Sequence, residues 1–418
     1  MRTSCLLLFL FGIMAGMPAE AQRKVTDLSQ LVALVLQRNP RLQAERLETR
    51  ALDRRAEAGG VLPSPGLAFE LRNVGWDRLT VGDEMMSGFG ISVTQNVPFP
   101  PKLKLHSRSA QLEASQQAQM TEETRLALVR EAKQLYAQIF YSQRSCELLR
   151  KKKSLLEKGL SLAQTRYALG QGLQADLFKA QVEISQTEGM LLEVEEVLGS
   201  LQARVAYLLA FEPDSVEVVA AELPVSSLQL TISDLQARAL MANPRLRGAE
   251  LEKERAAVAE RLARAGFLPD FMVRAGTMFR GRFPDMYEVM IGLELPLYWN
   301  REKNLLAEAR LRQEGAQLRA LDLQNEIIRA VRESFVAAKS AEARVALYRE
   351  RTIPQAERSL QATLSGYQVG RVDFLSLLSD IHSLITYEIE YARSLADLWI
   401  AAAQLEELTG FEILPLDR

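Results

Sequence analysis

The sequence predicts a mainly α-helical protein with a small β part, in which the second half of the chain repeats the first. Two long stretches, 102–167 and 301–366, have the pattern of long helices, and 128–167 spaces its apolar residues by threes and fours as coiled coils do. Two pairs of shorter stretches alternate apolar and polar residues, which is the period of a β-strand. A Tyr-x-x-Gly turn interrupts the helical pattern twice, at 167–170 and 367–370. Because Gly adopts positive φ without steric cost, each turn predicts the tip of an antiparallel helical hairpin.

The first 21 residues predict a secretory signal peptide. An apolar run from Cys5 to Ala15 precedes the small-residue cleavage site Ala19-Glu20-Ala21. The mature chain then keeps Cys146 as its one cysteine, so we expect no intramolecular disulfide. Beyond the signal peptide the sequence has no run of about 18 apolar residues. If the mature chain enters a membrane, we expect it to do so as strands.

The composition excludes several classes of function. Lys and Arg number 51 against 53 Asp and Glu, and the net charge of −2 gives no basic field for nucleic acid. No Gly-rich phosphate loop, Ser/His/Asp set or acidic metal cluster occurs, so we expect neither an enzyme nor a cofactor. His106 and His382 are isolated, and no Cys/His pair has metal-ligand spacing, so we expect no metal site.

The two halves of the chain share their motifs in the same order. Asn39-Pro40 recurs as Asn243-Pro244, where Pro fits the first turn of a new helix, and Val61-Leu62-Pro63 recurs as Phe267-Leu268-Pro269. This agreement predicts an internal duplication.

Pro354 predicts a kink in the second long helix. The expected parts are the signal peptide (1–21), N-terminal helices (22–66), a first β-hairpin (67–98), a first long helical hairpin (99–210, tip 167–176), an equatorial segment (211–232), a repeat helix (233–266), a second β-hairpin (267–298), a second long helical hairpin (299–409, tip 367–376) and a C-terminal tail (410–418).

The predicted strands have one apolar and one polar face. Residues 67–74 and 88–97 form the first hairpin, and 271–279 and 287–297 form the second. Membrane barrels use segments of this kind, but soluble sheets show the same alternation, and the strands alone favour the soluble sheet. Four strands are too few for a barrel, because even small barrels need about eight. Several copies would have to pool their strands above a hollow cylinder of helices about 100 Å tall.

The order of these motifs resembles that of the TolC-type outer-membrane factors of bacterial tripartite efflux and type I secretion systems. The resemblance rests on the tips Tyr167-x-x-Gly170 and Tyr367-x-x-Gly370, the two Asn-Pro helix starts, and the strand ends 95–100 and 295–300. It covers nearly all of the mature chain. The strand end 295–300, Leu-Pro-Leu-Tyr-Trp-Asn, is most similar to the branch paired with heavy-metal RND efflux pumps.

The resemblance implies an architecture and a set of partners. It implies a homotrimer in the outer membrane of a Gram-negative bacterium, with four membrane strands per protomer in a 12-stranded β-barrel and an α-barrel tunnel extending into the periplasm. The tunnel tip would dock a periplasmic adaptor (membrane fusion) protein and, through it, an inner-membrane RND-type transporter. Many relatives carry a lipidated N-terminal cysteine, which this chain lacks at its predicted cleavage site.

The resemblance also suggests gating residues at the tips. Asp176 matches a family position whose acid pairs with the tyrosine of the second turn and with an arginine, here Tyr367 and Arg371. Arg371 stands one position earlier than in well-known members. The alternative is structural: an acid at a helix start, favoured by the helix dipole, and a solvated arginine.

A constriction ring is a separate expectation from the same resemblance. Ser376 occupies a place where relatives often carry a pore-lining acid, so a ring of carboxylates here would have to use Asp373 or Asp380.

The tip surface suggests a docking site for the adaptor. Gly170, Leu173, Gly370 and Val372 would form a small apolar surface at the end of the tunnel. They could equally be turn residues only, because turns need Gly in any case.

The second hairpin is rich in methionine, and aromatic residues lie near the strand ends. Thioethers bind soft Cu(I) but also fill irregular apolar surfaces, so the methionines predict no metal site by themselves. The tryptophans and tyrosines lie where membrane barrels carry interfacial girdles of aromatic residues, although a soluble hairpin would tolerate aromatic residues at these positions. The residues concerned are Met272, Met278, Met286, Met290, Trp76, Tyr287, Tyr298 and Trp299.

The function predicted from the sequence is a passive outer-membrane exit duct for efflux, energised by its partners. Two alternatives stay open at this stage: a duct for type I protein secretion, and a soluble periplasmic coiled-coil scaffold, which the helices alone would allow.

Overall fold

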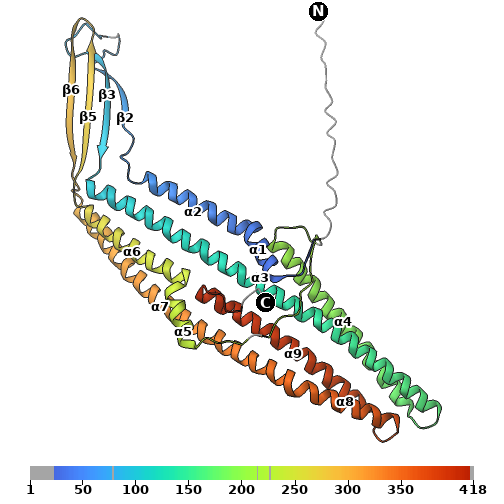
Figure 1. Cartoon of the computed structure of the whole chain (residues 1–418). Helices are drawn as coiled ribbons and strands as arrows, with labels where there is room; N and C mark the ends of the chain where they lie inside the picture. Colours follow the sequence, from blue (N-terminus) through green and yellow to red (C-terminus); the bar gives the residue numbers. More distant parts are fainter. Residues whose placement is uncertain (1–22, 78–79, 214, 226, 415–418) are drawn as a thin grey trace, which may run out of the picture.

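The computed structural model describes residues 23–77, 80–213, 215–225 and 227–414. The predicted signal peptide and the last four residues of the tail lie outside these ranges. The described chain is elongated, with a small sheet at one end, the tips of two helical hairpins at the other, and long helices between them (Figure 1). No helix in the described ranges is both long and apolar enough to cross a membrane.

The first half runs from two short helices through a β-hairpin into a long helical hairpin. Pro40 and Pro100 each occupy the first position of a helix, where the missing N–H costs nothing. At about 1.5 Å per residue α3 is about 100 Å long, close to the length expected from the sequence. The elements are β1 (Arg23–Val25), α1 (Leu28–Arg38), α2 (Pro40–Ala58), β2 (Gly66–Arg72), β3 (Gly88–Val97), α3 (Pro100–Ala168) and α4 (Gln174–Leu208).

The second half repeats this order, with one interruption in its long helix. Directly before Pro354 the helix widens into a π-helical segment, because proline has no N–H to donate and its ring clashes with the carbonyl one turn earlier. The disturbance expected at Pro354 therefore takes the form of a π-helical turn. The elements are β4 (Val216–Val218), α5 (Ile232–Ala242), α6 (Pro244–Ala265), β5 (Asp270–Arg280), β6 (Phe283–Glu294), α7 (Trp299–Leu347), the π-helical segment η1 (Tyr348–Thr352), α8 (Ile353–Gln368) and α9 (Phe374–Thr409).

The two β-hairpins join into one antiparallel sheet in the order β2-β3-β5-β6. The strand predicted over 287–297 in fact begins at Phe283 and ends at Glu294. Its earlier start follows from Gly281, whose φ of 64° permits a two-residue turn between Arg280 and Phe283. One sheet face is apolar and exposed, with Ile291 75% accessible. Within the described chain β2 and β6 each have one edge without a strand partner.

A short parallel pair of strands near the middle of the molecule was not predicted. β1 pairs with β4 in register, with Val25 opposite Val218. Both valines are fully buried in the main core. Strands of three residues are too short to show a period in the sequence, so no pattern could have predicted this pair.

In each half of the chain, the repeated Asn-Pro motif joins the start of one helix to the end of another. Asn39 Oδ1 accepts from the Leu42 amide at the start of α2, while Nδ2 donates to the Leu208 carbonyl at the end of α4, 2.9 Å away. Asn243 does the same in the second half, bonding the Leu246 amide and the Leu408 carbonyl. One side chain therefore caps the start of one helix and the end of another. This double role explains why the motif is repeated.

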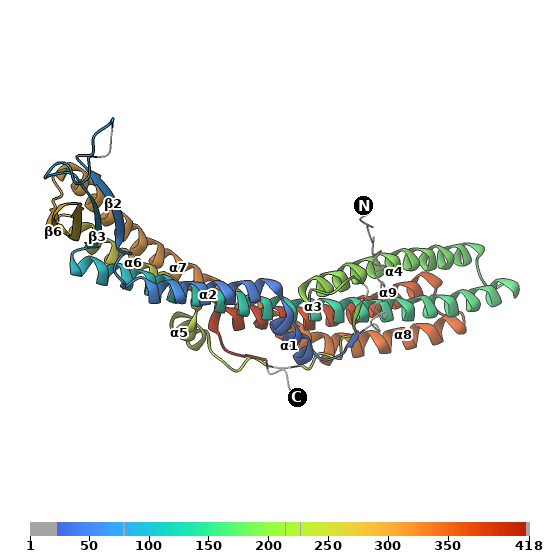
Figure 2. The same ribbon diagram turned by 90° about the horizontal axis from the view of Figure 1, so that it is seen from above.

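Helix α3 is the centre of the helical body. It packs against α2 and α6 toward the sheet and against α4 and α9 toward the tips. From the tips, α4, α3, α9 and α8 lie side by side in that order (Figure 2). The predicted apolar seam of α3 is buried, with Ala132, Leu135 and Ile139 fully inaccessible. Consequently α4 and α8 are the two outer edges of this layer.

Candidate functional site

Both tip turns end their helices in the same way. Gly170 has φ of 70° and Gly370 has φ of 78°, the left-handed conformation predicted for them. The Gln171 amide donates to the Arg166 carbonyl at 2.8 Å, and the Arg371 amide donates to the Gly366 carbonyl at 2.8 Å. These six-to-one bonds close the Schellman motif that satisfies the last carbonyls of a helix.

In each turn a glycine lets the residue two positions after the tip glycine pack closely against the end of the helix, but the position of that glycine differs between the two turns. In the first turn a Cβ at Gly172 would lie 3.2 Å from the Arg166 Cβ, so the small residue is the one after the turn. In the second turn a Cβ at Gly366 would lie 2.6 Å from Val372 Cγ2, so the small residue is on the helix. Val372 therefore packs back onto its own turn and is half-buried, which leaves only part of its side chain on the tip surface.

Arg166 connects the two hairpins at their tips. Its Nη1 donates to the Tyr367 carbonyl at 2.7 Å, and its guanidinium lies 4.7 Å from the centre of the Tyr367 ring. Its Nη2 donates to the Gln171 carbonyl of its own turn at 3.2 Å. Arg166 thus satisfies carbonyls at two helix ends, which the planar fork of a guanidinium allows. Sequence reasoning missed Arg166, because Tyr367 lies about 200 positions later in the chain and no local pattern joins the two residues.

Tyr367 is buried at the tips. It is 2% exposed and its ring lies 5.4 Å from that of Phe374 at the start of α9. Its hydroxyl is buried and has no hydrogen-bond partner in the described chain. Burial raises the pKa of Tyr367, and the Asp176 carboxylate raises this pKa further, while Arg166 opposes the shift. The hydroxyl is therefore a neutral donor at the tip.

The structure brings two of the predicted gating residues together within one protomer. Asp176 lies in the first turn of α4, close enough to act on Tyr367 electrostatically. The side chain of Arg371 is exposed and makes no hydrogen bond or ion pair with the described residues of its own chain. Within the protomer, Arg166 is the arginine that contacts Tyr367.

The two carboxylates considered for a constriction have partners in their own chain. Asp373 caps α9, accepting from the Ser376 amide at 2.8 Å, and the pKa of Asp373 is lowered first by the hydrogen bond from the Ser376 side chain and then by the one from its amide. Asp380 accepts from the hydroxyls of Ser359 at 3.0 Å and Thr363 at 2.5 Å, which fastens α9 to α8.

The exposed apolar surface of the tips includes two residues that the sequence reasoning omitted. Gly170, Gly370 and Leu173 are exposed, as predicted. Leu169 and Val369 are also exposed, at 67% and 68%. Each of these residues stands directly before the tip glycine. An apolar residue at this position in both turns is the sequence pattern from which their exposure could have been predicted.

A second apolar seam runs along α4 on the side away from α3. Its positions follow one another by threes and fours, as in a coiled coil, and all are exposed. Tyr207 is 81% and Leu192 68% exposed, and a Cβ added at Gly189 or Gly199 would meet no atom within 4 Å. The seam consists of Phe178, Val182, Ser185, Gly189, Leu192, Glu196, Gly199, Ala203 and Tyr207.

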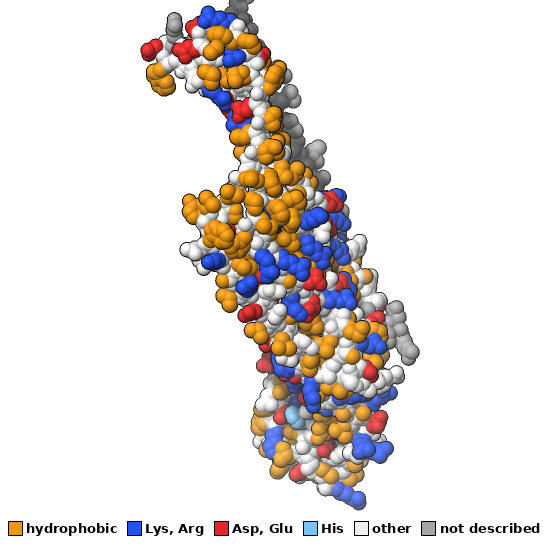
Figure 3. Space-filling view, turned by 90° about the vertical axis from the view of Figure 1, so that its left-hand side faces the viewer, with side chains coloured by type: hydrophobic (Ala, Val, Ile, Leu, Met, Phe, Trp, Pro, Cys, Tyr) orange, Lys and Arg blue, Asp and Glu red, His pale blue; other side chains and the backbone are white. Residues whose placement is uncertain are grey.

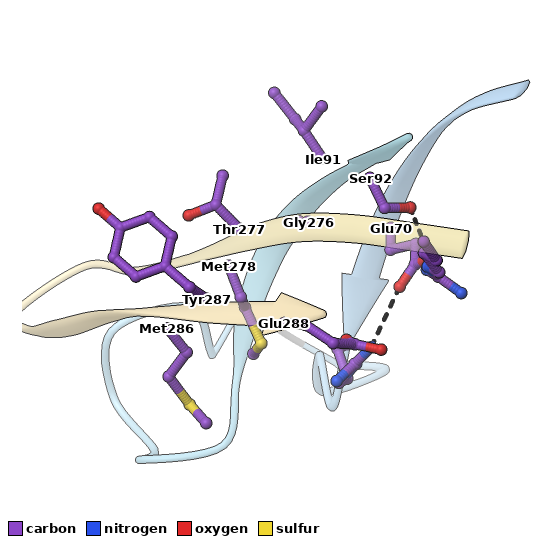
Figure 4. Close-up of a pocket in the computed structure, with 12 residues that line it drawn as sticks. Glu70, Ile91, Ser92, Gly276, Thr277, Met278, Met286, Tyr287 and Glu288 are labelled. Carbon is purple, nitrogen blue, oxygen red and sulfur yellow. Dashed lines mark hydrogen bonds and ion pairs between the residues drawn. The ribbon is translucent and has the colours of Figure 1, made fainter. Parts of the chain in front are cut away.

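The polar face of the sheet carries a chain of alternating charges. Arg274 pairs with Glu70, and Arg72 bridges Glu70 at 3.2 Å and Glu288 at 3.4 Å. Figure 4 shows Glu70, Ser92 and Glu288 on this face, with Met278 and Met286 beside them. Each acid meets an arginine, so the face is locally neutral. The described residues contain no group of three or more His, Cys, Asp or Glu that could hold a metal ion.

These features define a wall segment of an oligomeric membrane channel: a sheet with one apolar face and two open edges above a layer of helices with two open edges. A model of the outer membrane efflux protein family matches residues 31–209 and 235–411. The chain belongs to this family, and its two matched ranges correspond to the two halves of the duplication.

Known proteins resemble this chain over almost its full length. The cobalt-zinc-cadmium resistance protein CzcC of Cupriavidus metallidurans is 24% identical over 410 residues, which cover 94% of this chain and 92% of that protein. The outer membrane protein VceC of Vibrio cholerae has a TM-score of 0.78 at 19% identity, over 93% of this chain and 97% of that one. CusC has a TM-score of 0.79 at 15% identity, over 96% and 95% of the two chains. The fold is that of the outer-membrane efflux channels, and the protein is an exit duct of this class.

Proposed function

We propose that this chain is the outer-membrane duct of a metal-efflux system, assembled as a homotrimer and joined through a periplasmic adaptor to an inner-membrane RND-type transporter. The observation that carries the proposal is the likeness, over nearly the whole of both chains, to a protein named for cobalt, zinc and cadmium resistance. The duct supplies a passage, and its partners supply the energy. No specific feature favours a protein cargo.

The open edges of the molecule support a trimer. Three copies would contribute twelve strands, enough to close a barrel, whereas one copy has four. The exposed seam of α4 would pack against the opposite edge of the helical layer in the next copy, where Leu347 of α7 is 50% exposed. Knobs-into-holes packing would then cover the side chains that one chain leaves in water.

The seam gives a direct test of the trimer. Leu192→Glu places a charge in the seam and should convert the purified trimer to smaller species, measured by light scattering after size exclusion. Gln186→Glu adds the same charge about a third of a turn away from Leu192 around α4 and should leave the trimer intact. A trimer that survives Leu192→Glu would refute this use of the seam.

For the gate, we propose that Asp176, Tyr367 and Arg371 hold the closed tip, with Asp373 at its rim. The exposed side chain of Arg371 would reach Asp176 of the neighbouring copy, whose carboxylate acts electrostatically on Tyr367. Arg371→Gln should raise single-channel conductance in planar bilayers, and Arg371→Lys should restore part of the closure. Equal conductance in all three proteins would rule out the latch.

For docking, we propose that the adaptor binds Gly170, Leu173, Gly370 and Val372 together with Leu169 and Val369. Leu173→Glu should abolish cross-linking to the adaptor, while Gln181→Glu, higher on α4, should have no effect. Retained cross-linking in Leu173→Glu would place the adaptor elsewhere.

The cargo is tested in cells that lack this chain. Complementation with the intact chain should lower cell-associated cobalt, zinc and cadmium, measured by elemental mass spectrometry. Unchanged metal content, with restored export of a large protein, would favour the secretion alternative.

A further inference from the structure

An apolar collar surrounds the junction between the sheet and the long helices. It is built from the two repeated links between helix and strand and from the segment after β6. Tyr298 is 83% and Leu297 71% exposed, although large apolar side chains are usually covered. In Figure 3 hydrophobic side chains gather where the sheet meets the helical body. The collar consists of Val61, Leu62, Leu268, Leu295, Leu297, Tyr298 and Trp299.

A band of positive charge adjoins this collar on the helical side. The helix ends next to the sheet are residues 52–58, 100–108, 258–265 and 299–306. They hold nine Lys and Arg against four Asp and Glu, while the whole chain has 51 against 53. Figure 3 shows Lys and Arg side chains directly below the hydrophobic region. The balanced charge of the chain therefore hides a local excess.

Three cations of the band have no acidic partner in the described chain. Lys104 on α3, Arg261 on α6 and Lys303 on α7 are exposed and make no ion pair there. The neighbouring acids already have partners: Glu260 contacts Arg264 at 2.7 Å and Arg310 at 3.5 Å, and Glu302 contacts Arg301 at 3.1 Å. The excess positive charge is thus not neutralised within the protein.

We propose that the collar and the three free cations form a binding surface for anionic phospholipid in the inner leaflet of the outer membrane. The collar continues the exposed apolar face of the sheet toward the helices. In a protein of this family the collar would therefore lie at the surface of the membrane that the sheet enters. Tyr298 and Trp299 have an apolar body and a polar tip, which suits the boundary between acyl chains and headgroups. Lys104, Arg261 and Lys303 then lie at the level of the phosphates, where their long stems cover apolar surface and their charges meet anions.

Fluorescence quenching by brominated lipid tests this surface in the full-length protein. The variant Trp76→Phe/Trp399→Phe leaves Trp299 as the one tryptophan, within the collar. We would reconstitute it in phosphatidylethanolamine vesicles that contain equal mole fractions of brominated phosphatidylglycerol or brominated phosphatidylcholine. The lipid beside Trp299 should be enriched in phosphatidylglycerol about fivefold, the factor given by the attraction of one basic residue to an anionic surface.

Charge-removing variants decide whether the three cations cause the enrichment. Adding Lys104→Gln/Arg261→Gln/Lys303→Gln should abolish the preference for phosphatidylglycerol while both lipids still quench. The control Lys158→Gln/Arg349→Gln/Arg358→Gln removes equal charge from exposed positions on α3, η1 and α8 and should keep the preference. Equal quenching by both lipids in the parent, or a preference that survives removal of the three cations, would overturn the anionic site. Quenching by neither lipid would overturn the collar itself. These outcomes do not depend on the cargo or on the adaptor.

Discussion

Arg166 of the first hairpin holds Tyr367 of the second through two contacts, a hydrogen bond of 2.7 Å to its carbonyl and a guanidinium 4.7 Å from its ring. Because the two residues belong to different hairpins, this contact ties both tips of one protomer together. Arg166→Gln removes the charge and the fork, and we expect the free energy of local opening at the tips to fall by about 1–3 kcal/mol. Hydrogen exchange of the amides in 167–176 and 367–376 measures it.

Arg371→Gln is the matched control for this prediction, because the Arg371 side chain makes no hydrogen bond or ion pair with the residues that the structure describes in its own protomer. In the closed trimer the two variants should differ: Arg371→Gln should alter conductance, while Arg166→Gln should alter exchange protection as well. Identical exchange profiles for Arg166→Gln and the parent would contradict the cross-hairpin tie.

The contact between Gly366 and Val372 predicts a suppressor pair. Gly366→Ala would put its Cβ 2.6 Å from Val372 Cγ2, so we expect a loss of thermal stability equivalent to about 1–3 kcal/mol. Val372→Ala removes the clashing methyls and should restore most of this loss. Gly248→Ala on α6, whose nearest neighbour would lie 3.8 Å away, should be neutral or stabilising by up to about 1 kcal/mol. A variant Gly366→Ala as stable as the parent would show that Val372 moves freely.

The double caps at Asn39 and Asn243 predict equal effects in the two halves. Asn39→Ala loses both the Leu42 amide bond and the 2.9 Å bond to the Leu208 carbonyl. We expect each alanine variant to lower stability by about 1–3 kcal/mol, because the Leu208 carbonyl is left without its donor. Asn39→Asp keeps an acceptor for the helix start but has no amide donor, so it should recover only part of the loss. Thermal unfolding midpoints of the four proteins give the comparison, and full recovery in Asn39→Asp would assign the whole effect to the helix start.

The cap at Asp373 predicts a pH dependence at the tip. The hydrogen bond from Ser376 holds the pKa of Asp373 below its usual value of 3.8. A depressed carboxyl pKa contributes stability that is present above the unfolded pKa and is lost as the pH falls through the folded one. We therefore expect exchange protection at the start of α9 to weaken below about pH 4.

Two substitutions separate the cap from a gating role. Asp373→Asn keeps a capping oxygen and should remove this pH dependence with little loss of protection at pH 7, whereas Asp373→Ala should lose protection at both. If Asp373 also lines the opening, Asp373→Asn will change ion selectivity without changing protection. Unaltered selectivity would leave Asp373 with the cap alone.

The sequence predicted the fold well where it repeats a period over many residues. The long helices, both tips, the first hairpin and the Asn-Pro helix starts occur where the spacing of apolar residues, Gly and Pro placed them. The pairing of β1 with β4 was missed because three residues carry no period. The early start of β6 was missed because a two-residue turn at Gly281 was not recognised.

The candidate site was predictable in its position but not in its contacts. The repeated Tyr-x-x-Gly turn identifies the two tips. Because Leu173 lies in the first of these turns, its exposure could be expected. Arg166 was missed because its partner lies on the other hairpin, and only the packing of α3 against α9 brings them together. The half-burial of Val372 could not be predicted, because it depends on the absence of a side chain at Gly366.

The π-helical segment Tyr348–Thr352 makes the two hairpins of one chain mechanically unequal. Helix α3 runs unbroken from the sheet to its tip, while the corresponding helix of the second half changes its winding partway along. In a ring of three such chains, hairpins with a continuous helix therefore alternate with hairpins whose helix contains a π-helical segment. We expect the aperture to widen by movement of the second hairpin of each chain about its π-helical segment, while the three first hairpins keep their position.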